Sequence, residues 1–266
     1  MSNMLMRLKK NKILRNMCAE TTFLNDQLIQ PIFVSENLES KKEIPGIPNN
    51  FVMNLKESIQ QIELDLKNNQ KNFLLFMIPK DKKDSDFNFN FQQNVISTIK
   101  NKFKNDMLLW ADVCLCSMTT HGHCCLFDNK KNIDLSSTLS TLSKIALNYS
   151  QAGVDGIAPS DMMDGRTASI RKILDDNKYN LVPIMSYSSK FASNFYGPFR
   201  YAADSSPSFG DRKQYQLDYR NKSEAIRASV RCFEEGADLL MVKPGQGSID
   251  LIEEIKIKTG LMVGAY

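Results

Sequence analysis

The sequence has no apolar run long enough to cross a membrane, and it has no large excess of either charge. Its 34 basic and 30 acidic residues leave a net charge of +4. Proteins that bind nucleic acid cluster basic residues on one face, and this balance gives no sign of such a cluster. The N-terminus also lacks the apolar core of a secretory signal. We therefore expect a cytoplasmic protein that binds neither a membrane nor nucleic acid.

The N-terminal residues 1–16 are basic and rich in Met and Leu, but they lack the Ser and Arg content of a transit peptide. We interpret residues 1–25 as an arm that packs on a neighbouring subunit. Residues 26–266 are enough for one large domain, and an α/β barrel can occupy this length. The hydrophobic content of 42% allows a sizeable core.

Segments typical of strands alternate with segments typical of helices along residues 26–266. The predicted strands lie at 28–34, 73–78, 108–114, 154–158, 181–185, 237–242 and 261–265. The predicted helices lie at 54–68, 95–103, 136–150, 168–174, 223–235 and 249–258. Repeated strand–helix units indicate a parallel sheet with crossover helices. Seven such units favour an α/β fold of the (β/α)₈ TIM-barrel type over an open sheet.

Two stretches do not fit this repeat. Residues 80–90 are polar and charged, and we expect a solvated loop there. Residues 192–221 form a long connection that contains aromatic residues and three arginines. A long loop at the catalytic face of a barrel is usually a lid, and an ordered surface loop is the alternative.

Two lysines end apolar runs that are typical of buried strands. Lys190 ends the run that starts at Val182, and Lys243 ends the run that starts at Ala237. Ligands of parallel α/β proteins bind at the carboxyl ends of the strands. Burial lowers the pKa of a lysine, and the neutral amine is the nucleophile that imine formation needs. The pair therefore indicates an enzyme that forms imines with carbonyl substrates.

Four of the six cysteines lie within twelve positions, namely Cys114, Cys116, Cys124 and Cys125. Cys114 and Cys116 share one side of an extended segment, and a turn at Gly122 can bring Cys124 back toward them. Three thiolates leave the fourth position of zinc open, which is typical of a catalytic zinc site. Buried core thiols are the alternative. The two histidines of the chain, His121 and His123, suit a partner of the metal ligands or a proton carrier.

Further polar residues occupy positions suited to substrate binding. The run Ala158–Arg166 follows the fourth predicted strand, where acidic and hydroxyl groups suit proton transfer. Alternatively, Ser160 or Asp161 caps the next helix. Arg200 and Arg212 lie in the predicted lid, and arginine binds carboxylates in bidentate fashion. Ordinary surface charge is the alternative for both arginines.

Together these segments resemble the porphobilinogen synthase family, also called the 5-aminolevulinic acid dehydratase family. The resemblance covers nearly the whole chain, and motifs of this length in this order are very specific. The matching motifs are Asp112–Cys116, His121–Cys124, Ala158–Arg166, Met185–Ser193, Phe195–Arg200, Phe209–Lys213, Tyr215–Gln216, Glu235–Asp238 and Met241–Pro244.

The resemblance implies a (β/α)₈ barrel with an N-terminal arm that assembles as an oligomer, usually a homo-octamer. It implies an enzyme that condenses two 5-aminolevulinate molecules into porphobilinogen and releases two waters. Lys243 would form the imine with the first substrate and Lys190 the imine with the second. The cofactor would be Zn²⁺. The other implied site residues are Cys114, Cys116 and Cys124 on the zinc, Arg200 and Arg212 on the second substrate's carboxylate, Asp112 as the proton handler, and Ser160, Tyr196, Phe199 and Gln216 lining the site.

The sequence also departs from the family. The family continues beyond the seventh strand with a serine-containing turn and an eighth strand, so we expect a C-terminally truncated member without the eighth strand and C-terminal helix. Cys125 replaces a family glycine and offers a fourth thiolate. Ala228 stands where many bacterial relatives have a glutamate for an allosteric magnesium. Two alternative functions follow: an inactive remnant that keeps zinc and subunit contacts, and an imine-forming aldolase, against which the cysteine cluster counts.

Overall fold

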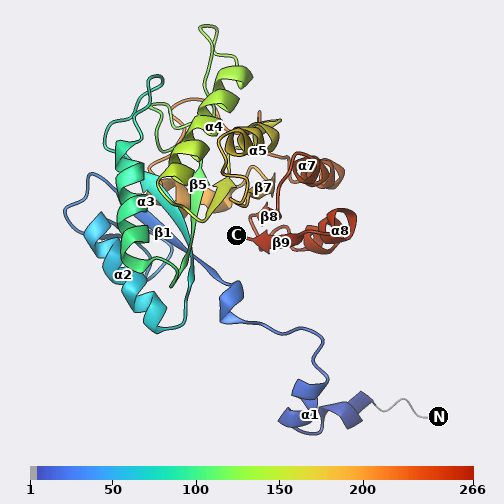
Figure 1. Ribbon diagram of the computed structural model, residues 1–266. Helices are drawn as coiled ribbons and strands as arrows, with labels where there is room; N and C mark the ends of the chain where they lie inside the picture. The colour runs from blue at the N-terminus through green and yellow to red at the C-terminus, as the bar shows by residue number, and fades with distance from the viewer. Residues whose placement is uncertain (1–4) are drawn as a thin grey trace.

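The computed structural model describes residues 5–266. Mainly parallel strands form the centre of the molecule (Figure 1). They form two sheets, in the orders β2-β3-β1-β4-β5-β6 and β7-β8-β9, and an isolated bridge between Ile157 and Ile184 connects the two. β2 is antiparallel to β3, whereas the other pairs are parallel. The strands are β1 (Ile29–Ser35), β2 (Lys42–Glu43), β3 (Phe51–Met53), β4 (Asn72–Ile78), β5 (Leu108–Val113), β6 (Gly156–Pro159), β7 (Met185–Lys190), β8 (Leu239–Lys243) and β9 (Met262–Ala265).

Helices connect successive strands and cover the outside of the sheets (Figure 1). The longer ones are α2 (Leu55–Lys67), α3 (Asn90–Phe103), α4 (Leu135–Gln151), α5 (Arg166–Asp176), α7 (Lys222–Glu234) and α8 (Asp250–Thr259). The short ones are α1 (Lys12–Met17) and α6 (Gly197–Ala202), with 3₁₀ turns η1 (Leu5–Lys9), η2 (Asn25–Gln27) and η3 (Asn194–Tyr196). The α/β class with parallel strands and crossover helices is confirmed, and the strands described do not close into a complete barrel.

Side-chain caps fix where two of these helices begin. The Asn54 side chain accepts a hydrogen bond from the Glu57 N–H, and the Glu57 carboxylate accepts one from the Asn54 N–H. Asp134 accepts a hydrogen bond from the N–H of Ser137 at the start of α4. Such caps satisfy N–H groups that have no partner within the helix, and each contributes about 1 kcal/mol.

The central strands are buried on both faces, which creates an inner and an outer core. Along β4, Phe73, Leu75 and Met77 pack against the helices in the outer core. Leu74 and Phe76 alternate with them and pack in the inner core. Side chains alternate along a strand, and parallel sheets covered by helices bury both faces. The inner core therefore surrounds the strand ends where the predicted site lies.

The fifth strand differs from its predicted position. The predicted range 181–185 is wrong, because β7 begins at Met185 and continues to Lys190, which is the second part of the apolar run Val182–Lys190 that the sequence also indicates as a strand. Leu181 is 90% exposed and lies in the connection that precedes the strand. Pro183 has no N–H to donate to a ladder, so the chain before Ile184 does not extend the sheet. The short elements β2, β3 and α6 were not predicted, since each has too few residues to show a periodic pattern.

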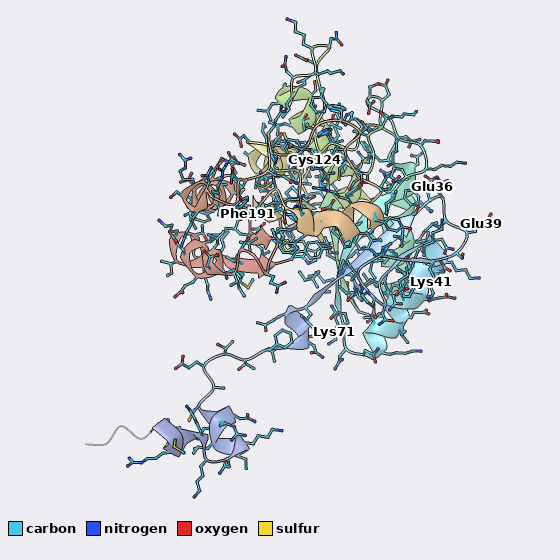
Figure 2. All side chains as sticks on the ribbon, turned by 180° about the vertical axis from the view of Figure 1, so that it is seen from behind. Glu36, Glu39, Lys41, Lys71, Cys124 and Phe191 are labelled. Atoms are coloured by element: carbon cyan, nitrogen blue, oxygen red, sulfur yellow. The ribbon has the colours of Figure 1, made fainter. Side chains whose placement is uncertain are left out.

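The N-terminal segment with η1 and α1 lies away from the body of the molecule, and its side chains stand free of the barrel strands (Figures 1 and 2). It exposes large apolar side chains, including Met6, Ile13, Met17 and Phe23. Residues 1–4 of the predicted arm lie outside the described residues. Within residues 5–266, no helix combines the length and the apolar character needed to span a membrane.

Candidate active site

Lys190 and Lys243 lie next to each other at the carboxyl ends of β7 and β8. They are register partners in the parallel pair, and each is 4% exposed. The Lys190 Nζ donates a hydrogen bond of 2.6 Å to the backbone carbonyl of Ser160, at the end of β6. Two buried amines from adjacent strands therefore face the same interior, as the sequence predicts for imine chemistry.

Aromatic rings surround the Lys243 amine. Its Nζ lies 3.6 Å from the ring centroid of Tyr266 and 3.9 Å from that of Phe199. The rings of Tyr187 and Tyr196 are each 5.6 Å away. Burial, together with the positive charge of Lys190, holds the pKa of Lys243 well below its usual value. A lysine in this state supplies the neutral amine that attacks a carbonyl carbon.

Asp112 stands at the end of β5, beside both lysines. The carboxylate oxygen Oδ1 is buried and has no hydrogen-bond partner among the described residues. Burial raises the pKa of Asp112 to about 6, although the Ser160 hydroxyl and the charges of Lys190 and Lys243 oppose the rise. A carboxyl group with such a pKa can accept and release protons near neutral pH, which suits the predicted role of proton handler.

Cys114, Cys116 and Cys124 form one buried cluster, in which the three sulfur atoms all lie within 4.8 Å of one another. The Sγ atoms of Cys114 and Cys116 are 3.3 Å apart. Hydrogen bonds from these two thiols hold the pKa of Cys124 well below its usual value. Three converging sulfur ligands fit a metal that prefers thiolates, so the cluster can hold a metal ion. The hypothesis of a fourth thiolate receives no support, because Cys125 packs in the outer hydrophobic core.

The turn that returns Cys124 to the cluster depends on Gly122, as predicted. Gly122 has a φ of +70°, and a Cβ there would lie 2.3 Å from the carbonyl oxygen of Ser206. Only glycine fits both the left-handed backbone and this close approach. Because Ser206 belongs to the predicted lid, the cysteine loop and the lid are in direct backbone contact.

His123 is linked to the backbone of Cys124 through Tyr215. One ring nitrogen, Nδ1, lies 3.0 Å from the Tyr215 hydroxyl, and the other, Nε2, lies 2.9 Å from the carbonyl of Phe209. The Tyr215 hydroxyl accepts a hydrogen bond from the N–H of Cys124 at 3.4 Å. The link from His123 through Tyr215 to the Cys124 backbone is compatible with the predicted role of a partner of the metal ligands. This contact of Tyr215 was not predicted, because the only signal for Tyr215 in the sequence was its place in a motif of the family.

The predicted lid contains η3 and α6, and it places Arg200 and Arg212 near the cysteine cluster. Arg212 is buried and donates hydrogen bonds to the carbonyls of Gly122, at 2.9 Å, and Ser205. Arg200 is half-buried, and burial together with the charge of Arg212 lowers its pKa. The side-chain amide of Gln216 is buried, and both its polar atoms lack partners within residues 5–266. The Nε atoms of Arg200 and Arg212 also lack partners there, and together with the Gln216 Nε2 they are donors that suit the carboxylate of a bound substrate.

The residues of the site enclose little free space. Asp112, Cys114, Cys116 and Phe199 line a cavity of about 10 Å³, which is room for about one water molecule. Arg200 lines a separate pocket of about 400 Å³, together with Tyr201 and Ala202 of α6. A substrate of several carbon atoms therefore requires α6 and the rest of the lid to move.

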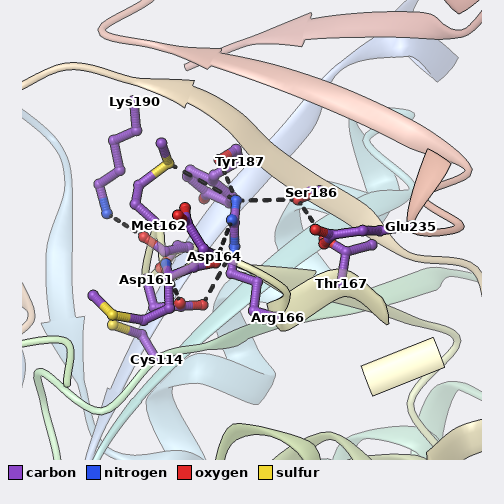
Figure 3. A network of polar contacts seen from close by, with 12 residues as sticks. Cys114, Asp161, Met162, Asp164, Arg166, Thr167, Ser186, Tyr187, Lys190 and Glu235 are labelled. Carbon is purple, nitrogen blue, oxygen red and sulfur yellow. Dashed lines mark hydrogen bonds and ion pairs between the residues drawn. The ribbon is translucent and has the colours of Figure 1, made fainter. Parts of the chain in front are cut away.

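The loop from Ser160 to Gly165 does not cap α5 through Ser160 or Asp161. Helix α5 begins at Arg166, and Gly165 occupies the capping position, so the capping alternative is wrong. The loop instead brings the Ser160 carbonyl to Lys190, while Asp161 and Arg166 form a buried polar network (Figure 3). The role of Arg166 was not predicted from the sequence, although a fully buried arginine is unusual.

Sequence comparisons agree with this geometry. The profile of the family described as delta-aminolevulinic acid dehydratase matches residues 2–266. The delta-aminolevulinic acid dehydratase of Methanothermus sociabilis is 43% identical over 263 residues, which are 98% of this chain and 82% of that protein. The delta-aminolevulinic acid dehydratase of Halalkalibacterium halodurans is 41% identical over 264 residues, covering 98% of this chain and 80% of that protein.

A structural comparison points the same way. The crystal structure of delta-aminolevulinic acid dehydratase (porphobilinogen synthase) from Toxoplasma gondii ME49, in complex with the reaction product porphobilinogen, matches with a TM-score of 0.95 and 35% identity. The match covers 100% of this chain and 77% of that chain. Fold, motifs and overall similarity thus lead to one conclusion: this chain belongs to the delta-aminolevulinic acid dehydratase family.

Proposed function

We propose that this chain condenses two molecules of 5-aminolevulinate into porphobilinogen and releases two waters, a step of tetrapyrrole biosynthesis. The observation that carries the proposal is the register pairing of Lys190 with Lys243, two buried amines on adjacent strands. A condensation of two keto acids needs two carbonyl groups activated side by side, and each amine can activate one as an imine. Family membership supports the same reaction.

Lys243 binds the first substrate in this scheme. Its neutral amine adds to the ketone carbon of one 5-aminolevulinate, and loss of water leaves an imine. The lowered pKa that burial imposes increases the fraction of the amine that is unprotonated and able to react. The rings of Phe199 and Tyr266 exclude water from the bond that forms, which protects the imine from hydrolysis.

Lys190 binds the second substrate. The Ser160 carbonyl holds its Nζ in position, and a protonated imine would keep one N–H for the same bond. Arg200, Arg212 and Gln216 bind the carboxylate of this substrate. Tyr196 lines the site beside Lys243, since its hydroxyl donates to the Lys243 carbonyl at 3.0 Å. Asp112 takes up and returns the protons of the condensation, since its pKa of about 6 suits both directions.

Zn²⁺ is the metal that we propose for the cluster of Cys114, Cys116 and Cys124. The donor set supports this choice, because three thiolates with an open fourth position are typical of zinc in a catalytic site. When bound, the metal would act as a Lewis acid toward an oxygen or amine of the second substrate. His123 and Tyr215 would then keep the thiolate loop in place.

We also propose that the protein works in the cytoplasm as a homo-oligomer, an octamer in the form that the family resemblance implies. All cysteines in the described residues are free, which suits a reducing compartment. In the N-terminal arm, the apolar side chains of Ile13 and Met17 are 82% and 73% exposed. Such side chains suit burial on a neighbouring subunit. No finding supports the alternative of an inactive remnant.

The test is turnover of 5-aminolevulinate by the 266-residue chain supplied with zinc. A pyrrole-specific colour reagent should report porphobilinogen, and mass spectrometry should confirm its mass. Arg212→Lys should raise the KM for 5-aminolevulinate by about tenfold, because a lysine cannot bind the carboxylate in bidentate fashion. A zinc-loaded, folded chain that forms no product and retains no substrate after borohydride treatment would contradict the proposal.

A further inference from the structure

Strand β7 carries one residue more than its partner β8 requires. Between Ser186 and Ser189, three steps along β7 match two steps along β8. Ser188 and Ser189 are consecutive residues, which would point to opposite faces of a regular strand. Both of their hydroxyls nevertheless lie 2.9 Å from the hydroxyl of Ser229 on α7. An extra residue of this kind is a β-bulge, a feature that often redirects a side chain beside an active site.

The bulge decides which way Lys190 points. Side chains alternate along a regular strand, so Lys190 would face the same side as Ser186, whose hydroxyl lies 3.1 Å from that of Thr167 on α5. Because of the extra residue, Lys190 instead pairs with Lys243 and lies on the inner side, 5.6 Å from the ring of Tyr187. A strand without the bulge would turn this amine away from the site.

Arg166 holds the bulge in place. Its side chain is fully buried, and its guanidinium donates hydrogen bonds to the carbonyl of Tyr187, at 2.8 Å, and to the hydroxyl of Ser186, at 3.2 Å (Figure 3). The Tyr187 carbonyl lies where the ladder between the strands is interrupted. A buried carbonyl without a partner is costly, so the guanidinium stabilises the bulged form of the strand.

The same guanidinium holds the loop that contacts the Lys190 amine. It donates to the carbonyl of Met163 at 3.0 Å, and its Nε lies 3.5 Å from a carboxylate oxygen of Asp161. Asp161 in turn accepts a hydrogen bond of 2.7 Å from the Met163 N–H. This loop begins with Ser160, the residue whose carbonyl accepts the hydrogen bond from Lys190. One buried arginine thus connects both structures that fix the amine.

We infer that Arg166 is a positioning residue for Lys190, because it stabilises the bulge that turns the amine inward and the loop whose carbonyl holds it. The inference rests on the proposed function, since it assigns Arg166 to imine formation with the second substrate. Lys243 stands on β8, where Met241 packs inward and Val242 outward in regular alternation. Loss of the guanidinium therefore affects the two imines unequally.

The experiment compares the two lysines in Arg166→Lys. The full chain is incubated with 5-aminolevulinate and reduced with borohydride, and mass spectrometry of the digested protein quantifies the adduct on each lysine. A lysine at position 166 keeps the positive charge near Asp161, but it loses the guanidinium that donates to several acceptors at once. The adduct on Lys190 should fall at least about tenfold, because displacement of a reacting group by about 1 Å has a large effect on rate. The adduct on Lys243 should stay within about twofold of wild type.

The matched control is Arg171→Lys on the same helix. Arg171 donates to the carbonyls of Val182 and Tyr179, before β7 begins, and its substitution should leave the ratio of the two adducts unchanged. Equal losses on both lysines in Arg166→Lys, or no loss on either, would overturn the inference while the wild-type adducts uphold the proposed function. A wild-type chain with no adduct on either lysine would instead overturn the proposed function itself.

A second variant covers the case in which Arg166→Lys does not fold, as judged by its thermal unfolding. Ser186→Ala removes one acceptor of the guanidinium and leaves the arginine in place. Loss of one such hydrogen bond should lower the Lys190 adduct by about two- to threefold and spare the Lys243 adduct. An unchanged ratio of adducts in folded Ser186→Ala would count against the role of Arg166.

Discussion

Lys190 and Lys243 have the same functional group, the same burial and paired positions, but their surroundings differ. The Lys190 amine is fixed by a hydrogen bond to a backbone carbonyl. The Lys243 amine lies among four aromatic rings. The carbonyl sets the direction of one amine, whereas the apolar surroundings set the protonation state of the other. The comparison shows that two identical side chains can be prepared for one reaction by different physical means.

The largest expected effect comes from Lys243→Met, which removes the amine from the aromatic surroundings but keeps an apolar side chain there. Turnover should fall by about 10⁴-fold or more, because loss of a covalent nucleophile leaves only binding and orientation. Product formation measured with the pyrrole reagent checks this. Lys222→Met changes an exposed lysine in an ion pair with Glu254 and should remain active. Substantial residual turnover in folded Lys243→Met would contradict the imine role.

Lys190→Met removes the second amine and also a positive charge beside Lys243. Turnover should fall by about 10³-fold, since the second substrate loses its anchor. The positive charge of Lys190 lowers the pKa of Lys243, so its removal raises that pKa toward the usual value. The pH at which borohydride trapping on Lys243 reaches half its maximum should therefore move upward. An unchanged or lower midpoint would show that the two amines do not interact.

Removal of the metal should affect the reactions at Lys190 and Lys243 differently. Cys124→Ala breaks the cluster, and turnover should fall by about 100-fold because the Lewis acid that we propose is lost. The adduct on Lys243 should persist, because its aromatic surroundings do not include the thiols. Cys232→Ala changes a separate hydrophobic cluster that contains Ala225 and Leu251, and this variant should retain bound zinc as measured by elemental analysis. Simultaneous loss of zinc and of the Lys243 adduct in Cys124→Ala would refute this separation.

The smallest effect is expected from Phe199→Leu. The ring lies 3.9 Å from the Lys243 Nζ, and its cation–π attraction favours the charged amine, whereas burial favours the neutral amine. Leucine keeps most of the burial and loses the attraction, so trapping on Lys243 at neutral pH should stay within about threefold of wild type. A loss of more than about tenfold would mean that the aromatic ring itself, rather than its apolarity, prepares the amine.

Much of the fold could be predicted because each segment carries its own periodic signal. Buried parallel strands appear as apolar runs, and amphipathic helices appear between them. The strand was predicted too early, at 181–185, because Leu181 and Val182 are apolar like the residues that follow. Pro183 has no N–H to donate, so the hydrogen bonds between the strands do not begin there. Barrel type could be inferred only by counting units, since strand order depends on contacts between distant segments.

The site was partly accessible from the sequence. Strand-end lysines and converging cysteines follow from local patterns, and the family motifs supplied the remaining residues. The direction of Lys190 could not be derived, because alternation along β7 predicts the opposite face and the bulge depends on a contact with α5. The aromatic surroundings of Lys243 were also not predicted. They combine β7, α6 and the residue after β9, which meet only in the folded chain.

The close approach of Gly122 to Ser206 has a thermodynamic consequence. The cysteine loop and the lid also share the hydrogen bond from the Ser208 N–H to the His121 carbonyl, at 3.0 Å. Ordering of either segment reduces the entropy that remains to be lost by the other. Linkage between equilibrium affinities is reciprocal, so a metal ion bound at the cysteines is expected to increase the affinity for a carboxylate ligand, and a saturating carboxylate is expected to increase the affinity for the metal by the same free energy.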